Sequence, residues 1–473
     1  MLRKFTTHQK YIVAAIYVSS MVLSSLDATM VNVTLATLGR EFGVLPSEIE
    51  AVSVAYLVSL AVIMPASGWL VDRFGTKNVF LTALLIYAIT NLMAGFAQSL
   101  NQLVFFRALQ GLGGGLLVPV GMALLYRTFP PAERIAVGRV LMYALVLGPA
   151  LGPIVGGVIL QVSTWPWTFF AKVPIAVFAI VYGWRYLVDE PSDGDAGKLD
   201  WIGFLLGGFG LGAAMYAMLE GPDVGWTQPT IAAPGLIGLA LLIAFVWHEL
   251  RIPRPMVDLR LLNDRLLNST IRVSFFATAG FLGTLFLVPL FLQDVRGETP
   301  LISGLATMPE ALGVVVSTQL VARLYPKVGP SRLMGGSLLL VTAAILALSR
   351  VGLDTSLWLV GLVMFVIGFG MAGIFLPNQA ASMATIPRAK LGSASMVFSV
   401  QRQIASALGV ALLSTVLSVI GVTTLGNAGN EPNLAAWQTA FAVAAGLTFI
   451  GSCMGWTVPD EDAAETMQQR RGV

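Results

Sequence analysis

A single carboxylate interrupts the first long apolar run of the chain. Asp27 lies in the stretch from Leu26 to Val33, within the apolar run 11–37. A charged side chain at mid-membrane depth costs a few kcal/mol or more, so an intramembrane carboxylate normally faces a bundle interior or a water-filled path. We therefore predict that Asp27 binds protons in a buried site, and the alternative is a structural, hydrogen-bonded Asp.

Two more charged side chains lie inside apolar runs at comparable depths. At 1.5 Å per residue, Asp27 lies about 15 Å and Arg107 about 8 Å below the same membrane surface, so they can pair directly or through water if their helices adjoin. The alternative for Arg107 is that it binds backbone carbonyl groups. Glu310 has the nominal depth of Asp27 and follows Pro309, which can kink its helix. Asp27, Arg107 and Glu310 are the predicted proton-coupling residues.

The composition is that of a membrane protein. Hydrophobic residues make up 56% of the chain and charged residues 11%, against roughly 25% charged residues in soluble domains. The net charge of +3 is small and the basic residues lie at helix ends, so we expect no nucleic-acid partner. One cysteine, Cys453, and two histidines argue against a disulfide framework and against a metal site. No cofactor is expected apart from protons as coupling ions.

Apolar runs of the length needed to cross a bilayer, about 20 residues each, occur fourteen times. The predicted membrane spans are 11–37, 48–70, 78–97, 102–126, 135–160, 167–187, 199–219, 230–249, 267–292, 300–324, 333–350, 354–382, 391–419 and 435–456. Acidic residues at the ends of these spans, such as Glu220, Glu249 and Asp354, are expected in solvated interfaces. An even number of spans places both termini on one side.

The distribution of basic residues predicts the orientation. If the N-terminus is inside, cytoplasmic segments hold 21 of the 28 Lys and Arg residues and outer loops hold 3. Cytoplasmic loops are the ones enriched in Lys and Arg, so both termini are predicted to be cytoplasmic. Polar connections divide the chain into an N-terminal six-helix bundle (1–190), a two-helix insert with its linkers (191–260) and a C-terminal six-helix bundle with a short tail (261–473).

A charged loop follows the second span. It contains the predicted signature residues Gly68, Asp72, Arg73, Gly75 and Lys77. Gly68 permits close helix approach, Gly75 permits a tight turn, and Asp72 can pair with a helix N-terminus or a basic neighbour. The alternative is an ordinary turn enriched in basic residues.

A glycine repeat marks the fifth span. The motif residues are Gly148, Pro149, Gly152, Pro153, Gly156 and Gly157. Glycines four residues apart share one helix face and let another helix approach closely, while the prolines bend the axis. This face can form a seal against proton leak, or it can be ordinary close packing.

Substrate contacts are harder to predict from the sequence. The candidate cavity residues are polar or soft apolar side chains within the spans, namely Asn32, Gln110, Phe286, Met308, Asn378, Gln379 and Arg402. A buried amide is costly unless it is used, which favours Asn378 and Gln379. Arg402 is expected to be either structural or part of a gate.

These stretches together resemble the 14-span drug:proton antiporters of the major facilitator superfamily. The resemblance rests on the loop 68–77, on 107–115, on 148–157, on 26–32, and on the insert segments 199–203 and 254–260. It implies an all-α membrane protein of two six-helix bundles plus two extra central helices, in which the bundles rock around a central site. It also implies that 148–157 is the antiporter motif.

We therefore predict a multi-pass protein of the cytoplasmic (inner) membrane that is not an enzyme and exports hydrophobic, cationic drugs or toxic compounds in exchange for protons. A movement that changes water access to Asp27 or its distance from Arg107 would make it load and release a proton. No phosphate-binding loop is present, which argues against ATP-driven export. An exporter of an endogenous metabolite, lipid or siderophore is the first alternative, and a non-transporting sensor or scaffold is the second. A periplasmic adaptor is left open.

Overall fold

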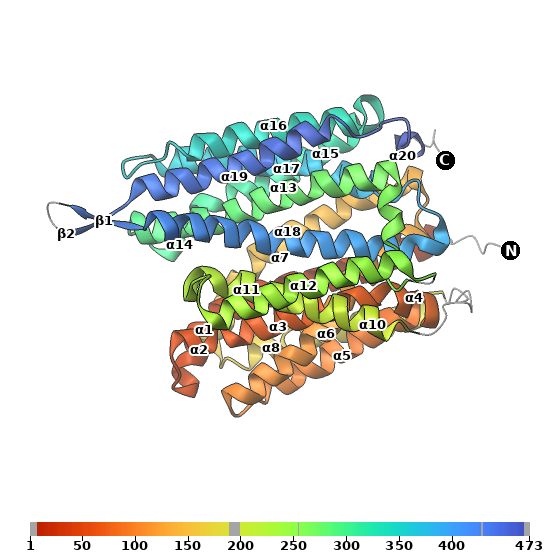
Figure 1. Ribbon diagram of the computed structural model, residues 1–473, viewed down its shortest axis with the longest axis horizontal. Helices are drawn as coiled ribbons and strands as arrows, with labels where there is room; N and C mark the ends of the chain where they lie inside the picture. Colours follow the sequence, from red (N-terminus) through yellow and green to blue (C-terminus); the bar gives the residue numbers. More distant parts are fainter. Residues whose placement is uncertain (1–6, 189–198, 254, 427–428, 468–473) are drawn as a thin grey trace.

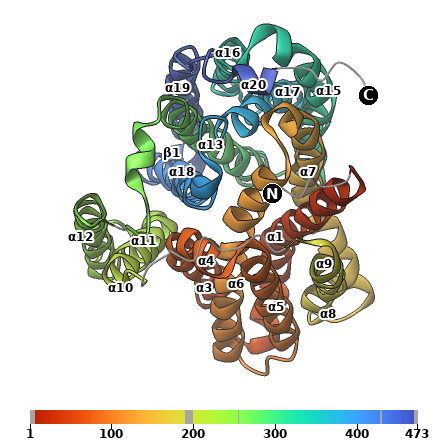
Figure 2. The same cartoon turned by 90° about the vertical axis from the view of Figure 1, so that its right-hand side faces the viewer.

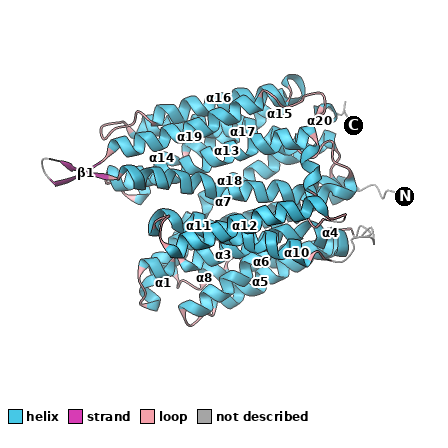
Figure 3. Cartoon of the chain, viewed as in Figure 1, coloured by secondary structure: helices cyan, strands magenta, loops and turns pink. Residues whose placement is uncertain are grey.

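The chain is an elongated bundle of nearly parallel helices (Figure 1). The computed structural model describes residues 7–188, 199–253, 255–426 and 429–467, without the side chains at 7–9, 28, 32, 36, 46–47, 143–150, 153, 424–426 and 429–431. Helix α1 begins and helix α20 ends at one end of the bundle, which we call the terminal end. A short antiparallel hairpin, β1 (Thr423–Gly426) and β2 (Gly429–Pro432), projects from the opposite end, which we call the hairpin end (Figure 3). The hairpin was not predicted.

The first half contains helices α1 to α9. Their bounds are α1 Thr7–Phe42, α2 Pro46–Ile49, α3 Ala51–Ile63, α4 Ser67–Phe74, α5 Thr76–Gly95, α6 Leu100–Thr128, α7 Arg134–Val162, α8 Trp167–Phe170 and α9 Val173–Tyr186. The insert contains α10 Trp201–Phe204, α11 Gly210–Val224 and α12 Pro229–Arg251.

The second half contains helices α13 to α20. Their bounds are α13 Arg265–Leu290, α14 Pro300–Thr307, α15 Pro309–Val328, α16 Pro330–Leu348, α17 Leu357–Ala381, α18 Leu391–Ile420, α19 Leu434–Gly455 and α20 Ala464–Met467. Single tight or wide turns connect several of these, namely η1 Met64–Ala66, η2 Pro131–Glu133, η3 Leu205–Phe209, η4 Leu259–Asn263, η5 Phe291–Val295 and η6 Arg388–Lys390.

The predicted spans correspond to these helices. In the described part of the chain, thirteen helical segments are long and apolar enough to cross a membrane. The remaining predicted span, 135–160, is the 29-residue helix α7. Helices α14 and α15 meet at Met308 because Pro309 cannot donate the backbone hydrogen bond that would continue the helix. The protein is thus a multi-pass, all-helical membrane protein, apart from the small hairpin.

Each half packs around its own apolar core. One buried cluster consists of residues from α13 to α19 and the chain after α19, and two others consist of residues between α1 and α9. Viewed from the terminal end, the two halves lie on either side of the long helices α7 and α18 (Figure 2). The insert helices lie to one side, where α11 contacts both α3 and α18. Trp226, just after α11, donates an indole hydrogen bond of 2.8 Å to Thr415 on α18.

Glu249 on the insert helix α12 does not lie in a solvated interface. Its side chain is 1% exposed, and its Oε2 accepts a 3.2 Å hydrogen bond from the backbone of Val257. On the same turn, His248 Nε2 lies 2.9 Å from Asp200 Oδ2. The sequence position of Glu249 at a helix end was misleading because the chain after α12 folds back over it.

The two halves meet at the terminal end. A buried apolar cluster there combines first-half residues such as Tyr126 and Phe129 with second-half residues such as Met383 and Phe398. The Tyr126 hydroxyl donates a 2.5 Å hydrogen bond to the backbone carbonyl of Gln379. These contacts hold the ends of α6 and α17 together.

The signature loop lies at this junction. Gly75 has a φ of 80°, which allows the chain to turn directly from α4 into α5. A Cβ atom at Gly68 would lie 3.2 Å from Ser393 Cα on α18. Asp72 Oδ1 lies 3.7 Å from Arg127 Nη2 and beside the first turn of α18, at Gly392. The loop of the first half therefore contacts the positively polarised N-terminus of α18 in the second half.

Candidate functional site

The centre of the first half holds a buried carboxylate. Asp27 on α1 is 0% exposed. Its Oδ2 accepts a 2.6 Å hydrogen bond from Arg107 Nη1 on α6, and its Oδ1 accepts a 2.9 Å hydrogen bond from Gln110 Nε2. Asp27 and Arg107, which the sequence placed at comparable depths, are thus in direct contact.

Arg107 is held by more than its ion pair. Its Nε donates a 3.2 Å hydrogen bond to the carbonyl of Val52, and its guanidinium carbon lies 4.3 Å from the centre of the Tyr56 ring. Both residues belong to α3, which approaches α6 closely because Gly111 and Gly115 carry no side chain. A Cβ at Gly115 would overlap the carbonyl oxygen of Leu60. The glycines of α6 therefore position the guanidinium as well as the helix.

A second cation contacts Asp27. Lys172, between α8 and α9, is 1% exposed and its ammonium group donates to Asp27 Oδ1. The ammonium nitrogen also lies 4.8 Å from the Phe169 ring centre. Lys172 was not among the predicted site residues, although it lies within the predicted span 167–187. Its signal was present, because a Lys within an apolar run is as unusual as an Asp.

We call Asp27, Arg107, Gln110 and Lys172 the Asp27 cluster. Its formal charges are one negative and two positive. Buried ion pairs carry a large desolvation penalty, which is offset here by hydrogen bonds to both carboxylate oxygens. Adding a proton to Asp27 would leave two buried cations facing each other without a counter-ion. The charge balance between α1, α6 and the segment between α8 and α9 therefore depends on the protonation state of Asp27.

Glu310 lies apart from this cluster. It is half-buried in the first turn of α15, directly after the break at Met308. Within the described residues its carboxylate forms no hydrogen bond or ion pair. Helix α17 approaches this turn closely, since a Cβ at Gly368 would overlap the Glu310 carbonyl. A second acidic site is thus present in the second half, and its role in proton coupling stays a prediction.

The glycine motif of α7 faces α1 next to the Asp27 cluster. A Cβ at Gly152 would overlap the Thr29 hydroxyl, and one at Gly156 would lie 3.5 Å from Met30 Cα. A Cβ at Gly157 would meet nothing within 4 Å. The side chains of Pro149 and Pro153, and the surroundings of Gly148, lie outside what the structure describes. The packing that the glycine repeat predicted is therefore present at Gly152 and Gly156, and sealing stays a prediction.

A cavity lies between the two halves. It is lined by side chains from α1, α6, α7, α13, α17 and α18, including Tyr17, Asn378, Gln379 and Arg402. Phe375 and Phe398 supply aromatic surface. Three of the candidate cavity residues, Asn378, Gln379 and Arg402, thus lie together at the interface of the halves.

The other candidate cavity residues do not line this cavity. Gln110 belongs to the Asp27 cluster instead. Phe286 and Met308 have exposed side chains, 54% for Met308, and neither contributes to the cavity wall. Helical phase, which the sequence does not fix, decided these positions. The side chain of Asn32 lies outside the described residues.

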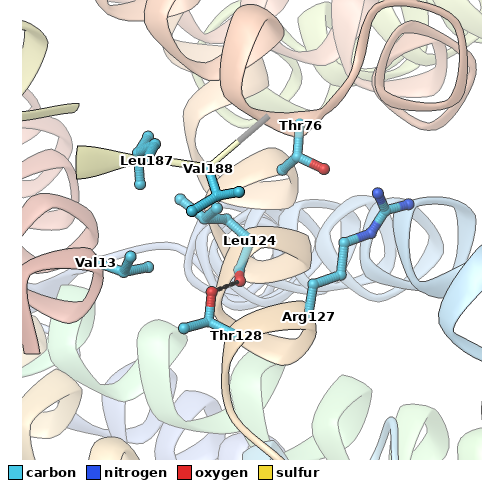
Figure 4. Close-up of a pocket in the computed structure, with 7 residues that line it drawn as sticks. All are labelled: Val13, Thr76, Leu124, Arg127, Thr128, Leu187 and Val188. Atoms are coloured by element: carbon cyan, nitrogen blue, oxygen red, sulfur yellow. Dashed lines mark hydrogen bonds between the residues drawn. The ribbon is translucent and has the colours of Figure 1, made fainter. Parts of the chain in front are cut away.

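A second, smaller pocket lies at the terminal end of the first half (Figure 4). It is lined by Val13, Thr76, Leu124, Arg127, Thr128, Leu187 and Val188. The Thr128 hydroxyl points back to the Leu124 carbonyl at 2.8 Å and so offers no donor to a ligand. None of the predicted site residues lines this pocket, and it carries no functional argument.

The fold and the sequence identify the family. The family profile described as Major Facilitator Superfamily matches residues 17–410. The chain belongs to the Major Facilitator Superfamily. As a member of this superfamily the protein is a transporter and not an enzyme, and the Asp27 cluster and the cavity lie within its membrane-spanning helices.

Several curated relatives of this transporter carry names that refer to drugs. The chain is 29% identical to the puromycin resistance protein pur8 of Streptomyces alboniger, over 95% of this chain and 92% of the relative. It is 28% identical to the multidrug resistance protein B homolog of Mycobacterium tuberculosis, over 86% and 76%. It is 27% identical to the putative multidrug resistance protein MdtD of Klebsiella pneumoniae, over 95% of both.

Solved transporters share the fold. The human organic anion transporter MFSD10 (TETRAN) superimposes with a TM-score of 0.68 at 16% identity, covering 94% of this chain and 99% of its own. The proton:xylose symporter XylE superimposes with a TM-score of 0.66 at 14% identity, covering 98% of both. At these identities the likeness concerns the fold alone.

Proposed function

We propose that the protein exports hydrophobic drugs or toxic compounds across the cytoplasmic membrane in exchange for protons. The observation that supports this most strongly is the Asp27 cluster, in which a fully buried carboxylate contacts two cations inside a membrane-spanning bundle. Such a charge arrangement is expensive in a bilayer and is typical of an ion or proton path. The names of the drug-resistance relatives support the cargo class.

In the proposed cycle, protonation of Asp27 drives the change of state. A proton reaching Asp27 from outside removes the negative charge that holds Arg107 and Lys172 together. The two cations then repel each other, and α6 and α9 move relative to α1. Release of the proton on the cytoplasmic side restores the ion pairs. Cargo binding between the halves and proton binding at Asp27 alternate in this scheme, which couples the two fluxes.

We assign the terminal end to the cytoplasm, in agreement with the Lys and Arg distribution. The contacts of Tyr126 with Gln379 and of Gly68 with Ser393 then close the cytoplasmic side. The cavity beside Arg402 lies just beyond this closure and would be reached from outside. Whether the cargo is cationic, as the sequence suggested, stays a prediction.

The test is transport by purified protein in liposomes. A pH gradient is imposed, and a panel of cationic, neutral and anionic hydrophobic compounds, including ethidium and puromycin, is supplied. Proton movement is followed with an internal pH dye. We expect at least one compound to drive proton flux through the wild type. Asp27→Asn should retain cargo binding and lose proton-driven transport.

Two further variants refine this experiment. Asp354→Asn changes an exposed loop acid at the hairpin end and serves as the matched control, with unchanged transport expected. Glu310→Gln distinguishes one proton carrier from two, because loss of coupling in both Asp27→Asn and Glu310→Gln indicates two. Absence of proton-linked flux for every compound would contradict drug export. Endogenous metabolites, lipids and siderophores would then be the cargo to examine.

A further inference from the structure

The cavity between the two halves contains an unusual positive charge. Among the described residues that line it, Arg402 on α18 carries the only formal charge. No hydrogen bond or ion pair within the described part of the chain reaches its guanidinium group. The titratable side chains that face it are those of Tyr17 and Tyr126, which are neutral phenols. Among the residues that the structure describes, Arg402 therefore has no counter-ion.

Other polar groups of the same cavity are also without partners. Asn378 on α17 is 1% exposed, and neither its amide nitrogen nor its amide oxygen has a hydrogen-bond partner among the described residues. The hydroxyl group of Tyr17 on α1 is likewise buried and unpaired there. Buried polar groups in native proteins are normally paired, so donors that have no partner among the described residues are available to the polar groups of a ligand in this cavity. These donors come from both halves.

The donors match an acidic group. Arg402 offers a planar set of N–H donors that suits the two oxygens of a carboxylate or sulfonate. Tyr17 and the amide of Asn378 can donate to the same oxygens. The rest of the wall contains Met122, Met142 and Phe375, whose adaptable apolar surfaces suit ligands of varied shape.

We propose that this cavity binds hydrophobic organic anions, with Arg402 as the counter-ion of their acidic group. The proposal rests on the proposed function, because it assumes that the cavity carries the cargo. It reverses the cargo charge expected from the sequence. That expectation relied on Asp27 as the binding partner of a cation, but Asp27 is fully buried and already contacts Arg107 and Lys172. A cationic ligand in the cavity would be repelled by the positive charge of Arg402, because no described residue of the cavity wall carries a negative charge.

The test compares probes of one shape and different charge. Naphthalene-2-sulfonate, its neutral sulfonamide and 2-naphthylmethylammonium are titrated calorimetrically into the wild type in nanodiscs of zwitterionic phosphatidylcholine. The wild type should bind the sulfonate at least 10-fold more tightly than the sulfonamide, and the ammonium most weakly. Because charge-assisted hydrogen bonds are lost, Arg402→Gln should bind the sulfonate about 10- to 100-fold more weakly than the wild type. Binding of the sulfonamide should change little.

Three further variants complete the test. Arg402→Lys should retain part of the preference for the sulfonate, and Asn378→Leu should weaken sulfonate binding without removing that preference. Arg272→Gln, at an exposed position of α13, is the matched control with wild-type binding expected. Equal binding of sulfonate and sulfonamide by the wild type would overturn the proposal and would indicate that the unpaired groups hold only water. Survival of the preference in Arg402→Gln would overturn it as well.

This outcome is separate from that of the proposed function. The binding experiment needs no pH gradient, so it can succeed even if no proton flux occurs. Conversely, transport of cationic drugs with proton flux, together with equal binding of the three probes, would support export and refute the anion site.

Discussion

At the scale of single residues, the distribution of charge around Asp27 determines what each substitution costs. Asp27 is the shared counter-ion of two cations, Arg107 and Lys172, and its single negative charge balances only one of them. Arg107 has a further carbonyl partner in Val52, and Gln110 also contacts it at 2.9 Å through Oε1. The loss of Asp27 and the loss of Lys172 are therefore not equivalent, although they break the same ion pair.

We expect Asp27→Asn to destabilise the protein more than Lys172→Met. Asp27→Asn leaves two buried cations without a counter-ion, a change that costs about 3–5 kcal/mol when a buried pair is broken. Lys172→Met leaves the Asp27–Arg107 pair neutral and replaces the ammonium with an apolar group of similar length. Thermal unfolding in detergent measures both, and the double variant should regain part of the loss. Equal unfolding temperatures for the two single variants would contradict this charge balance.

At the scale of secondary-structure elements, glycines set how closely helices approach around the charged groups. The glycines of α6 let α3 pack closely beside Arg107. Those of α7 let this helix pack closely against Thr29 and Met30 of α1, near Asp27. Helices in a bilayer gain little from apolar burial, so close packing of small residues contributes much of their association. The motif of α7 nevertheless contains glycines in different surroundings, and this difference can be tested.

We expect Gly152→Ala to impair the transporter and Gly157→Ala to leave it unchanged. A methyl group at position 152 would overlap the hydroxyl group of Thr29, which lies two residues after Asp27 on α1. The overlap would push α7 away from α1. Overpacking of this kind costs typically 1–3 kcal/mol. A methyl group at position 157 meets nothing within 4 Å. Transport and cargo-free proton leak in liposomes measure the effect, and increased leak in Gly152→Ala alone would support a seal. Equal effects of both variants would show that packing on α1 is not the reason.

At the scale of the whole molecule, the contact between the halves at the terminal end defines one state of the transport cycle. The signature loop of the first half contacts the start of α18 in the second half. Alternating access requires this contact to open, whereas a rigid scaffold would keep it closed.

We expect a disulfide across this contact to stop transport. A Cβ at Gly392 would lie 3.5 Å from Val71 Cβ, within the range found in disulfides. The variant Val71→Cys with Gly392→Cys is made in a Cys453→Ser background, because Cys453 is the single native cysteine. Oxidation should arrest transport and reductant should restore it, while each single-cysteine variant stays active. Full activity of the cross-linked protein would rule out opening at this end.

The orientation is tested by labelling. Asp354→Cys at the hairpin end and Lys390→Cys at the terminal end are both exposed positions. In a Cys453→Ser background, a membrane-impermeant thiol reagent should label Asp354→Cys in intact cells and Lys390→Cys only in inverted vesicles. The reverse pattern would place the terminal end outside and would reverse the direction of the proposed cycle.

Much of the fold could be predicted because its signals are local. Apolar length located the spans, and Pro309 predicted the bend between α14 and α15. Asp27 and Arg107 stood out because a charge in an apolar run is rare. Lys172 was missed although it is a charge within the predicted span 167–187. Phe286 and Met308 were expected in the cavity because rotation about a helix axis has no signal in an apolar sequence.

The sequence by itself determined the membrane-spanning class, the helices and the presence of a few expensive charges within them. These follow from the transfer energy of each side chain, which depends on the residue and its neighbours along the chain. Only the tertiary structure decided which charges meet. It brought two cations to Asp27 and, among the described residues, left Arg402 without an anionic partner. Such pairing depends on how helices distant in sequence rotate and pack against one another.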